Sequence, residues 1–287
     1  MKGLVTSHHG LRPERVSADA DVWVDPEHLD AYLNALSDVG WHEREASRAA
    51  HELIEHSVTL IHPEWPCDLD VHQSFPGFLR SREEVFEVLW ERREKLEIAG
   101  HITAIPDRTS AILITALHAM RSPHQTPRHG AELRGLVRDV IPALSSESQQ
   151  DLLGLATQLN AVDTARPVLA HVGLDLPAPV AAGSDSALDA WRQRTAGGEG
   201  RTTQFVLHIR STPWRERPRE VFRAIWPTEA DFRVEHYTVP PGYWHGVAGR
   251  LKRIAWGIRQ LPGVLRGRRL ARQGITDDSL LHEDGER

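Results

Sequence analysis

The sequence predicts a small mixed-sheet α/β (α+β) domain over residues 1–106, followed by a mostly helical domain over residues 107–275. Two observations predict this order. Short apolar runs bounded by turn residues, which are typical of strands, occur in the first third of the chain. From Thr109 onward, apolar residues recur three and four positions apart, which is the helical period. We expect residues 276–287, which contain five acidic side chains, to form a disordered tail.

The N-terminal elements follow from local signals. Asp25 and Pro26 are a favourable N-cap and first helical residue, and Gly40 is a typical helix end. Ser81 and Glu84 form a capping-box pattern that starts another helix. The expected elements are a helix from residue 2 to 7, a strand over 19–24, a helix over 26–39, a weakly patterned helix over 43–55, antiparallel strands over 58–62 and 68–73, a helix from residue 82 and a strand over 98–105.

Helical periodicity continues through the second half of the chain. It predicts helices over residues 109–121, 131–141, 146–159 and 161–172, and a mostly helical segment over 201–270. The stretch 177–186 is rich in Ala, Pro, Gly and Ser and is the best candidate for a linker, with a second break over 195–200.

Composition narrows the class of protein. Cys67 is the only cysteine of the 287 residues, which excludes an intrachain disulfide and favours a reducing compartment. No apolar run approaches the length of a membrane span, and no signal peptide opens the chain. We therefore expect a cytoplasmic protein that does not use a membrane as a partner.

Charge is distributed unevenly along the chain, whose net charge is −6. Residues 201–272 carry fifteen Lys and Arg against five Asp and Glu, whereas residues 1–200 carry eighteen against thirty. The basic segment would either steer a polyanion towards the acidic half or form a solvated helix face that pairs with it. A nucleic-acid-binding module is the further alternative, but no recognisable nucleic-acid-binding motif accompanies the basic residues.

Carboxylates gather on two of the expected strands. Residues two apart on a strand point to the same face, so Asp19 and Asp21 project together, as do Asp68, Asp70 and His72. If the two strands are neighbours, their carboxylates converge and repel one another unless a cation neutralises them. Hard oxygen ligands of this kind suit Mg²⁺ or Mn²⁺.

These motifs resemble a family of uncharacterised nucleotidyltransferases within the DNA polymerase β-like superfamily. The resemblance spans roughly residues 1–260. It is carried by Lys2-Gly3, Arg15, the Asp19-Ala20-Asp21 strand, Gly40-Trp41, the Asp68-Leu69-Asp70-Val71-His72 strand, and the C-terminal residues Trp226-Pro227, Arg233, Tyr237 and Pro240-Pro241-Gly242-Tyr243-Trp244. It implies a polymerase β-like nucleotidyltransferase fold for the first domain.

The resemblance also implies an activity and its residues. A nucleoside triphosphate (NTP) such as ATP would be the substrate, with Mg²⁺ or Mn²⁺ as cofactor. Asp19, Asp21 and Asp70 would be the catalytic metal ligands. The nucleotide would contact a further set of residues: Lys2, Gly3, Thr6, Ser7, Arg15 and His72. The acceptor is not identified by the sequence, and we expect a small molecule, peptide or protein rather than a nucleic acid.

Several alternatives remain open at the level of sequence. Asp68 shares a strand face with Asp70 and would replace it as the third ligand, although the family pattern, with its acid two residues before a His, selects Asp70. His72 would orient Asp70, contact a phosphate, or simply bind a backbone carbonyl. Because Lys2-Gly3 has no residues packed in front of it, the alternative function is a catalytically weak family member that acts as a binding or regulatory partner.

Overall fold

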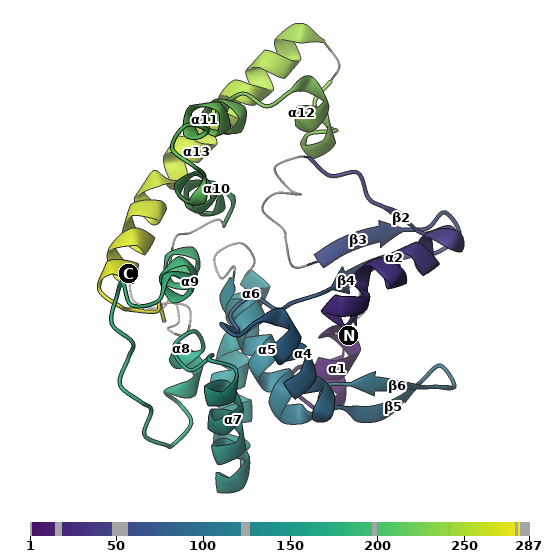
Figure 1. Ribbon diagram of the computed structural model, residues 1–287, viewed down its shortest axis with the longest axis vertical. Helices are drawn as coiled ribbons and strands as arrows, with labels where there is room; N and C mark the ends of the chain where they lie inside the picture. Colours follow the sequence, from purple (N-terminus) through teal and green to yellow (C-terminus); the bar gives the residue numbers. More distant parts are fainter. Residues whose placement is uncertain are drawn as a thin grey trace.

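The computed structural model describes residues 2–14, 19–47, 57–121, 127–196, 200–240, 242–278 and 281. Over these residues it confirms the coarse prediction of a small mixed sheet near the N-terminus with helices after it (Figure 1). The sheet has the strand order β1-β4-β3-β2. Its strands are β1 (Asp19–Trp23), β2 (His42–Glu43), β3 (Ser57–Ile61) and β4 (Asp68–His72).

Strand pairing in this sheet is both parallel and antiparallel. β3 runs antiparallel to β4, as the sequence predicted, and also to β2. β1 is parallel to β4, in a register that sets Asp21 beside Asp70. The weak helix predicted from residue 43 is wrong at its start, because Glu43 pairs with Leu60 in β2. Residues 48–55 of that prediction lie outside the described residues.

The two faces of the sheet differ because the strands alternate apolar and polar residues. Leu60, Leu69 and Val71 are buried on one face, where they pack with side chains of α2 (Leu29–Asp38). The other face carries the acidic residues of β1 and β4 by the period-two rule. Burial of one face therefore fixes which face presents the carboxylates.

Asp25 and Gly40 mark the start and the end of the segment that contains α2. The Asp25 carboxylate accepts a hydrogen bond of 3.0 Å from the backbone N–H of Glu27, at the start of a 3₁₀ turn that leads into the helix. Gly40 follows the helix with φ of +97°, and a Cβ there would lie 2.7 Å from Nε2 of His62. Both the predicted cap and the predicted stop are confirmed.

A hairpin replaces one of the predicted strands. The capping box of Ser81 and Glu84 starts α4 (Arg82–Glu91), as predicted. After it, β5 (Glu94–Ile98) and β6 (His101–Ile105) pair as a two-stranded antiparallel sheet. The prediction of a single strand over 98–105 was wrong, because Ala99 and Gly100 both adopt positive φ and turn the chain.

Helices account for most of the remaining described chain. At the centre of their core lies α5 (Arg108–Arg121), whose Leu117 is fully buried. Of the predicted helix over 161–172, only the short α8 (Arg166–Leu169) is helical, with Pro167 in its first turn, where a missing N–H is tolerated. The predicted helix over 131–141 ends in a π-helical turn, Leu136–Val140. The helices are α1 (Lys2–His8), α5 (Arg108–Arg121), α6 (Pro127–Gly135), α7 (Ser146–Gln158), α8 (Arg166–Leu169), α9 (Ser186–Ala196), α10 (Gly200–Ser211), α11 (Arg217–Ile225), α12 (Glu229–Glu235) and α13 (Tyr243–Arg272).

One apolar core crosses the domain boundary predicted at residues 106 and 107. Val5 and Phe75 from the N-terminal side pack in the same cluster as Leu117 and Trp191 from the helical side. The two predicted domains therefore share their largest core, with α5 between them.

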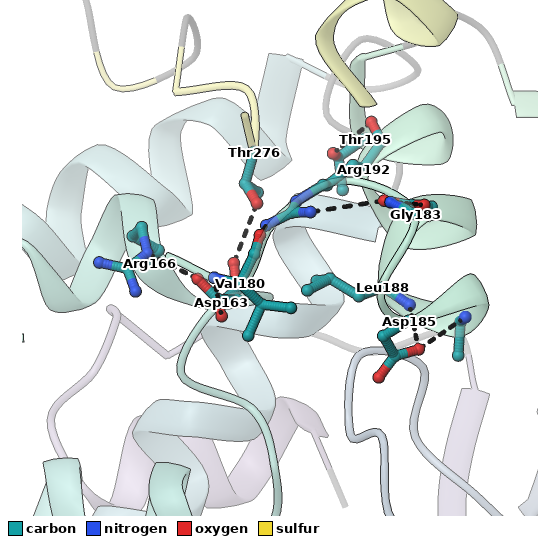
Figure 2. A network of polar contacts seen from close by, with 11 residues as sticks. Asp163, Arg166, Val180, Gly183, Asp185, Leu188, Arg192, Thr195 and Thr276 are labelled. Carbon is teal, nitrogen blue, oxygen red and sulfur yellow. Dashed lines mark hydrogen bonds and ion pairs between the residues drawn. The ribbon is translucent and has the colours of Figure 1, made fainter. Parts of the chain in front are cut away.

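The segment over 177–186, predicted to be a linker, is held against the helical core (Figure 2). The Val180 N–H donates to the Asp163 carboxylate at 3.2 Å, and the Val180 carbonyl accepts from Arg192 Nη2 at 2.8 Å. Arg192 is only 1% exposed. The loop is thus a fixed connection between α8 and α9 rather than a free tether.

The beginning of the acidic tail is also held. Thr276 is buried and its hydroxyl donates to the Asp163 backbone carbonyl at 2.9 Å (Figure 2). Asp277 lies 3.3 Å from Arg266 Nη2. The first residues of the predicted tail, Thr276 and Asp277, thus contact the helical core. Residues 279–280 and 282–287 lie outside the described part of the chain.

The C-terminal helices α10 to α13 form an arm (Figure 1), and its α12 contacts the chain beyond β2, where the Ser47 hydroxyl donates to the Glu235 carboxylate. The longest of them, α13, packs along α9, and its Gly249 gives the Phe232 ring of α12 room, since a Cβ there would lie 2.4 Å from that ring. None of the described helices combines the length and the apolar character that crossing a bilayer requires.

Candidate metal centre

Parallel pairing of β1 with β4 creates the candidate site. In this register Asp19 lies beside Asp68 and Asp21 beside Asp70, so the acids project from adjacent strands on one face. Strand parity predicted that the acids of each strand share a face. The pairing of β1 with β4 then brings the acids of the two strands together.

Three side chains of this face form a compact group. Among the described residues, Asp21, Asp70 and His72 each offer a ligand atom within 4.8 Å of the other two. Asp21 is 7% exposed and His72 3%, while Asp70 is half-buried. Two carboxylates at this separation, with one of them buried, gain from a cation between them. The two carboxylates favour Mg²⁺ or Mn²⁺, whereas an imidazole nitrogen is a ligand that suits zinc, copper, iron or nickel.

Hydrogen bonds orient both carboxylates. Thr59, directly opposite Asp70 on β3, donates its hydroxyl to Asp70 Oδ1 at 2.6 Å. His72 Nε2 lies 2.8 Å from Asp21 Oδ1, and the His72 ring stacks on Phe75. Because a carboxylate only accepts hydrogen bonds, Nε2 donates to Asp21 in this pair, and Asp21 is a partner that the sequence analysis did not name.

The structure separates Asp70 from its neighbour Asp68. The Asp68 carboxylate forms an ion pair with Arg44, a residue just beyond β2. Asp70 instead belongs to the compact group with Asp21. This arrangement supports the choice of Asp70 over Asp68 as the third carboxylate.

Asp19 lies at the exposed start of β1 on the same face as Asp21. It is not part of the compact group found among the described residues, in which His72 occurs instead. The three predicted ligands are therefore placed on one face, with two of them brought into direct proximity.

The predicted phosphate-binding segment forms the expected helix, α1. Within it, the Thr6 hydroxyl donates to the Gly3 carbonyl at 3.0 Å, and Thr6 is buried. Gly3 and Ser7 are half-buried, and Lys2 opens the helix. Arg15 lies outside the described residues.

An arginine near the acids, Arg121 at the end of α5, was missed by the sequence analysis. Burial and the charge of Arg194 lower the pKa of Arg121, while the charges of Asp21 and Asp70 raise it. Arg121 therefore lies within electrostatic reach of both carboxylates and of Arg194. The available sequence signal was a charged residue in the last turn of an otherwise apolar helix, α5.

A separate cavity lies in the C-terminal arm. It has a volume of about 820 Å³ and lies between α10, α11, α12 and α13, with mostly apolar side chains around it. Phe205, Ile225 and Trp256 contribute to its wall, together with the polar residues Glu235 and Lys252. Its lining includes none of the residues of the compact acidic group.

Comparisons with known proteins add no relative: no family model matches this chain, and no curated protein matches it either.

Proposed function

We propose that this chain is a metal-dependent nucleotidyltransferase with a polymerase β-like catalytic domain. It would transfer a nucleoside monophosphate from an NTP to a hydroxyl or phosphate acceptor and release pyrophosphate. The observation that carries the proposal is the compact group of Asp21, Asp70 and His72 on two adjacent parallel strands. The Asp-x-Asp motif of β1 and the Asp-x-His motif of β4 agree with it.

Each residue of the group has a role that follows from its contacts. Asp21 and Asp70 would hold the divalent ions, with Asp19 contributing from the exposed end of β1. His72 keeps Asp21 in position, and Thr59 does the same for Asp70. When bound, such ions neutralise charge on the phosphates and align the attacking oxygen with the leaving group.

The reaction balances with the residues present. An acceptor oxygen forms a bond to the α-phosphorus as the bond from that phosphorus to the bridging oxygen breaks. The electron pair of the broken bond leaves with pyrophosphate. Asp70, the less buried of the two central acids, would accept the proton of an attacking hydroxyl.

A screen with α-³²P-labelled NTPs tests this function. The full chain is incubated with each NTP, Mg²⁺ or Mn²⁺, and fractionated extract, and label transfer and pyrophosphate release are measured. We expect metal-dependent labelling that Asp21→Asn removes. The proposal fails if no NTP is consumed with either metal, or if Asp21→Asn labels the acceptor as fast as the parent.

A second candidate is a member of the same family that binds a metal nucleotide without transferring it. The specific observation that favours it is the placement of Asp19 outside the compact group. This candidate predicts stoichiometric NTP binding that requires metal, with no pyrophosphate released over hours.

A further inference from the structure

The cavity of the C-terminal arm is large enough to hold a small molecule. Its volume of about 820 Å³ lies within the range of protein sites that bind drug-sized ligands. Its wall combines the half-buried Phe205 and the buried Phe232 with the solvent-exposed Ile225, Trp256 and Leu261. A ligand in the cavity would remove apolar surface of these side chains from water, which favours binding.

Two glycines of α13 in the cavity wall differ in what lies next to them. A Cβ at Gly249 would lie 2.4 Å from the Phe232 ring, so close packing of α12 on α13 explains that glycine. A Cβ at Gly257 would come within 4 Å of no described side chain beyond its neighbours in the chain. Gly257 lies four residues after Arg253 and four before Leu261, which also line the cavity, so all three share one helix face. The wall is therefore open at Gly257, where a larger side chain would take up cavity space.

Three acidic or strongly basic side chains contribute to the wall: Glu235, Lys252 and Arg253. Two of them have partners within the protein. The Glu235 carboxylate accepts a hydrogen bond from the Ser47 hydroxyl, and Arg253 Nη1 donates to the Ala224 carbonyl. Lys252 is exposed and forms no ion pair or hydrogen bond with another residue of the described chain. Its ammonium group is thus the charge of the wall that can pair with a ligand.

We propose that this cavity binds an apolar molecule with one negative group, a fatty or aryl carboxylate, whose charge pairs with Lys252. The apolar wall would cover the hydrocarbon part, and Lys252 would hold the carboxylate at the solvent side. The charge of the surrounding segment suits an anion, because residues 201–272 carry fifteen Lys and Arg against five Asp and Glu. The inference is independent of the proposed nucleotidyltransferase activity, since the cavity lining includes none of the compact acidic group.

Other occupants of the cavity make different predictions. If its wall is only a contact surface for another protein chain, a small apolar molecule should not bind there at a single saturable site. If Glu235 decides the preferred charge, a cation with the same hydrocarbon chain should bind more tightly than the anion. Equal binding of the two would mean that the apolar wall adsorbs hydrocarbon without recognising charge.

Displacement of a fluorescent fatty acid from the full chain tests the proposal. Dansylaminoundecanoate is the probe, and the competitors are decanoate and decylamine, which have hydrocarbon chains of similar length and opposite charges. We expect the probe to bind at one saturable site, and decanoate to displace it at lower concentration than decylamine does. Lys252→Met should reduce this preference by roughly three- to tenfold, because an exposed charge pair contributes modestly to binding. Lys252→Arg should keep the preference.

Matched glycine variants locate the bound probe. Gly257→Leu should weaken probe binding by at least roughly tenfold, because the new side chain occupies the cavity and displaces apolar contact. Gly257→Ala should weaken it less. Gly154→Leu, at an exposed glycine of α7 whose Cβ would also meet open space, should leave binding unchanged. Thermal unfolding confirms that each variant folds.

Three results would overturn the proposal. The first is a parent chain that does not bind the probe at a saturable site. The second is a folded Gly257→Leu chain that binds the probe as tightly as the parent. The third is decylamine binding at least as tightly as decanoate, or a preference for decanoate that survives Lys252→Met unchanged. None of these measurements involves a nucleotide or a metal, so failure of the proposed transfer activity would leave them intact.

Discussion

The acidic face of β1 and β4 and the C-terminal arm of α10 to α13 are organised in opposite ways. On the acidic face, Asp21, Asp70 and His72 are partly or fully buried, and hydrogen bonds join His72 to Asp21 and Thr59 to Asp70. In the arm, large apolar side chains remain exposed, and Phe222 is 65% exposed. Fixed polar groups are what a reaction needs, whereas exposed apolar surface is typical of contact with another molecule.

The arm shows the contrast most clearly along α13. Leu251, Ile258 and Leu265 recur every seven residues and are all more than half exposed. Between Tyr243 and Arg272 the helix carries eight Lys and Arg and no acidic residue. Within the described part of the chain, the ordered polar group thus lies on the β1–β4 face, whereas α13 presents exposed apolar and basic side chains.

The largest expected effect is on the acidic face. Asp21→Asn and Asp70→Asn each remove one negative ligand while keeping side-chain size, and we expect each to lower the transfer rate by on the order of 10² to 10³. Asp19→Asn should lower it as well. Asp68→Asn is the matched control, because Asp68 pairs with Arg44, and it should cost far less. A dead Asp68→Asn beside an active Asp70→Asn would show that the wrong carboxylate was chosen.

Two substitutions in the arm test whether its buried and exposed apolar side chains differ in their contribution to stability. Phe232 is 1% exposed against α13, so Phe232→Ala should lower the free energy of unfolding by about 3 kcal/mol. Ile258→Ser, at a residue 60% exposed, should change it by less than about 0.5 kcal/mol. Urea unfolding measures both. Equal losses would mean that the face of α13 around Ile258 is covered in solution.

A smaller effect is expected from the groups that orient the acids. Thr59→Val removes the hydroxyl that donates to Asp70 while keeping the side-chain shape, and we expect a loss of about tenfold in transfer rate. His72→Gln keeps a donor near Asp21 and should lose less than His72→Ala. The rates are compared at saturating NTP. If His72→Gln and His72→Ala are equally slow, the donor role of Nε2 is wrong.

The smallest effect concerns acid stability of the helical core. A hydrogen bond from Arg92 lowers the pKa of Asp151 below its usual value of about 3.9. The folded state therefore holds the carboxylate ionised at pH values where the unfolded chain protonates it. The resulting stabilisation is present above pH 4 and is lost as the pH falls through the lowered pKa. Asp151→Asn should reduce the fall in stability on acidification, measured by urea unfolding between pH 5 and pH 2.5. If the pH dependence of stability is unchanged in this variant, the Arg92–Asp151 pair does not contribute to it.

Sequence reasoning recovered the parts of the site that local rules determine. Strand parity placed Asp19 and Asp21 on one face and Asp70 and His72 on another, and the pairing of β1 with β4 merges these faces. That pairing joins residues nearly fifty positions apart, and no local rule specifies it. The motif resemblance was therefore needed to expect it.

Other parts depend on tertiary packing and had no local signal. Arg121 comes within electrostatic range of Asp21 and Asp70 from the end of α5, which is distant from both acids in the sequence. The segment over 177–186 has the composition of a linker, but the buried Arg192 binds its backbone. The β5–β6 turn at Ala99 was missed because a non-glycine residue adopts positive φ there. In each case the deciding partner is distant in sequence or is a backbone conformation that composition does not reveal.

The most direct test of the central claim is where a divalent ion binds. Crystals of the full chain grown with a non-hydrolysable NTP analogue and Mn²⁺ would give an anomalous difference map that locates the metal. The account predicts a peak between β1 and β4, at roughly 2.0–2.3 Å from carboxylate oxygens of Asp21 and Asp70. A map with the ordered analogue bound elsewhere, or with no manganese at these two residues, would contradict it.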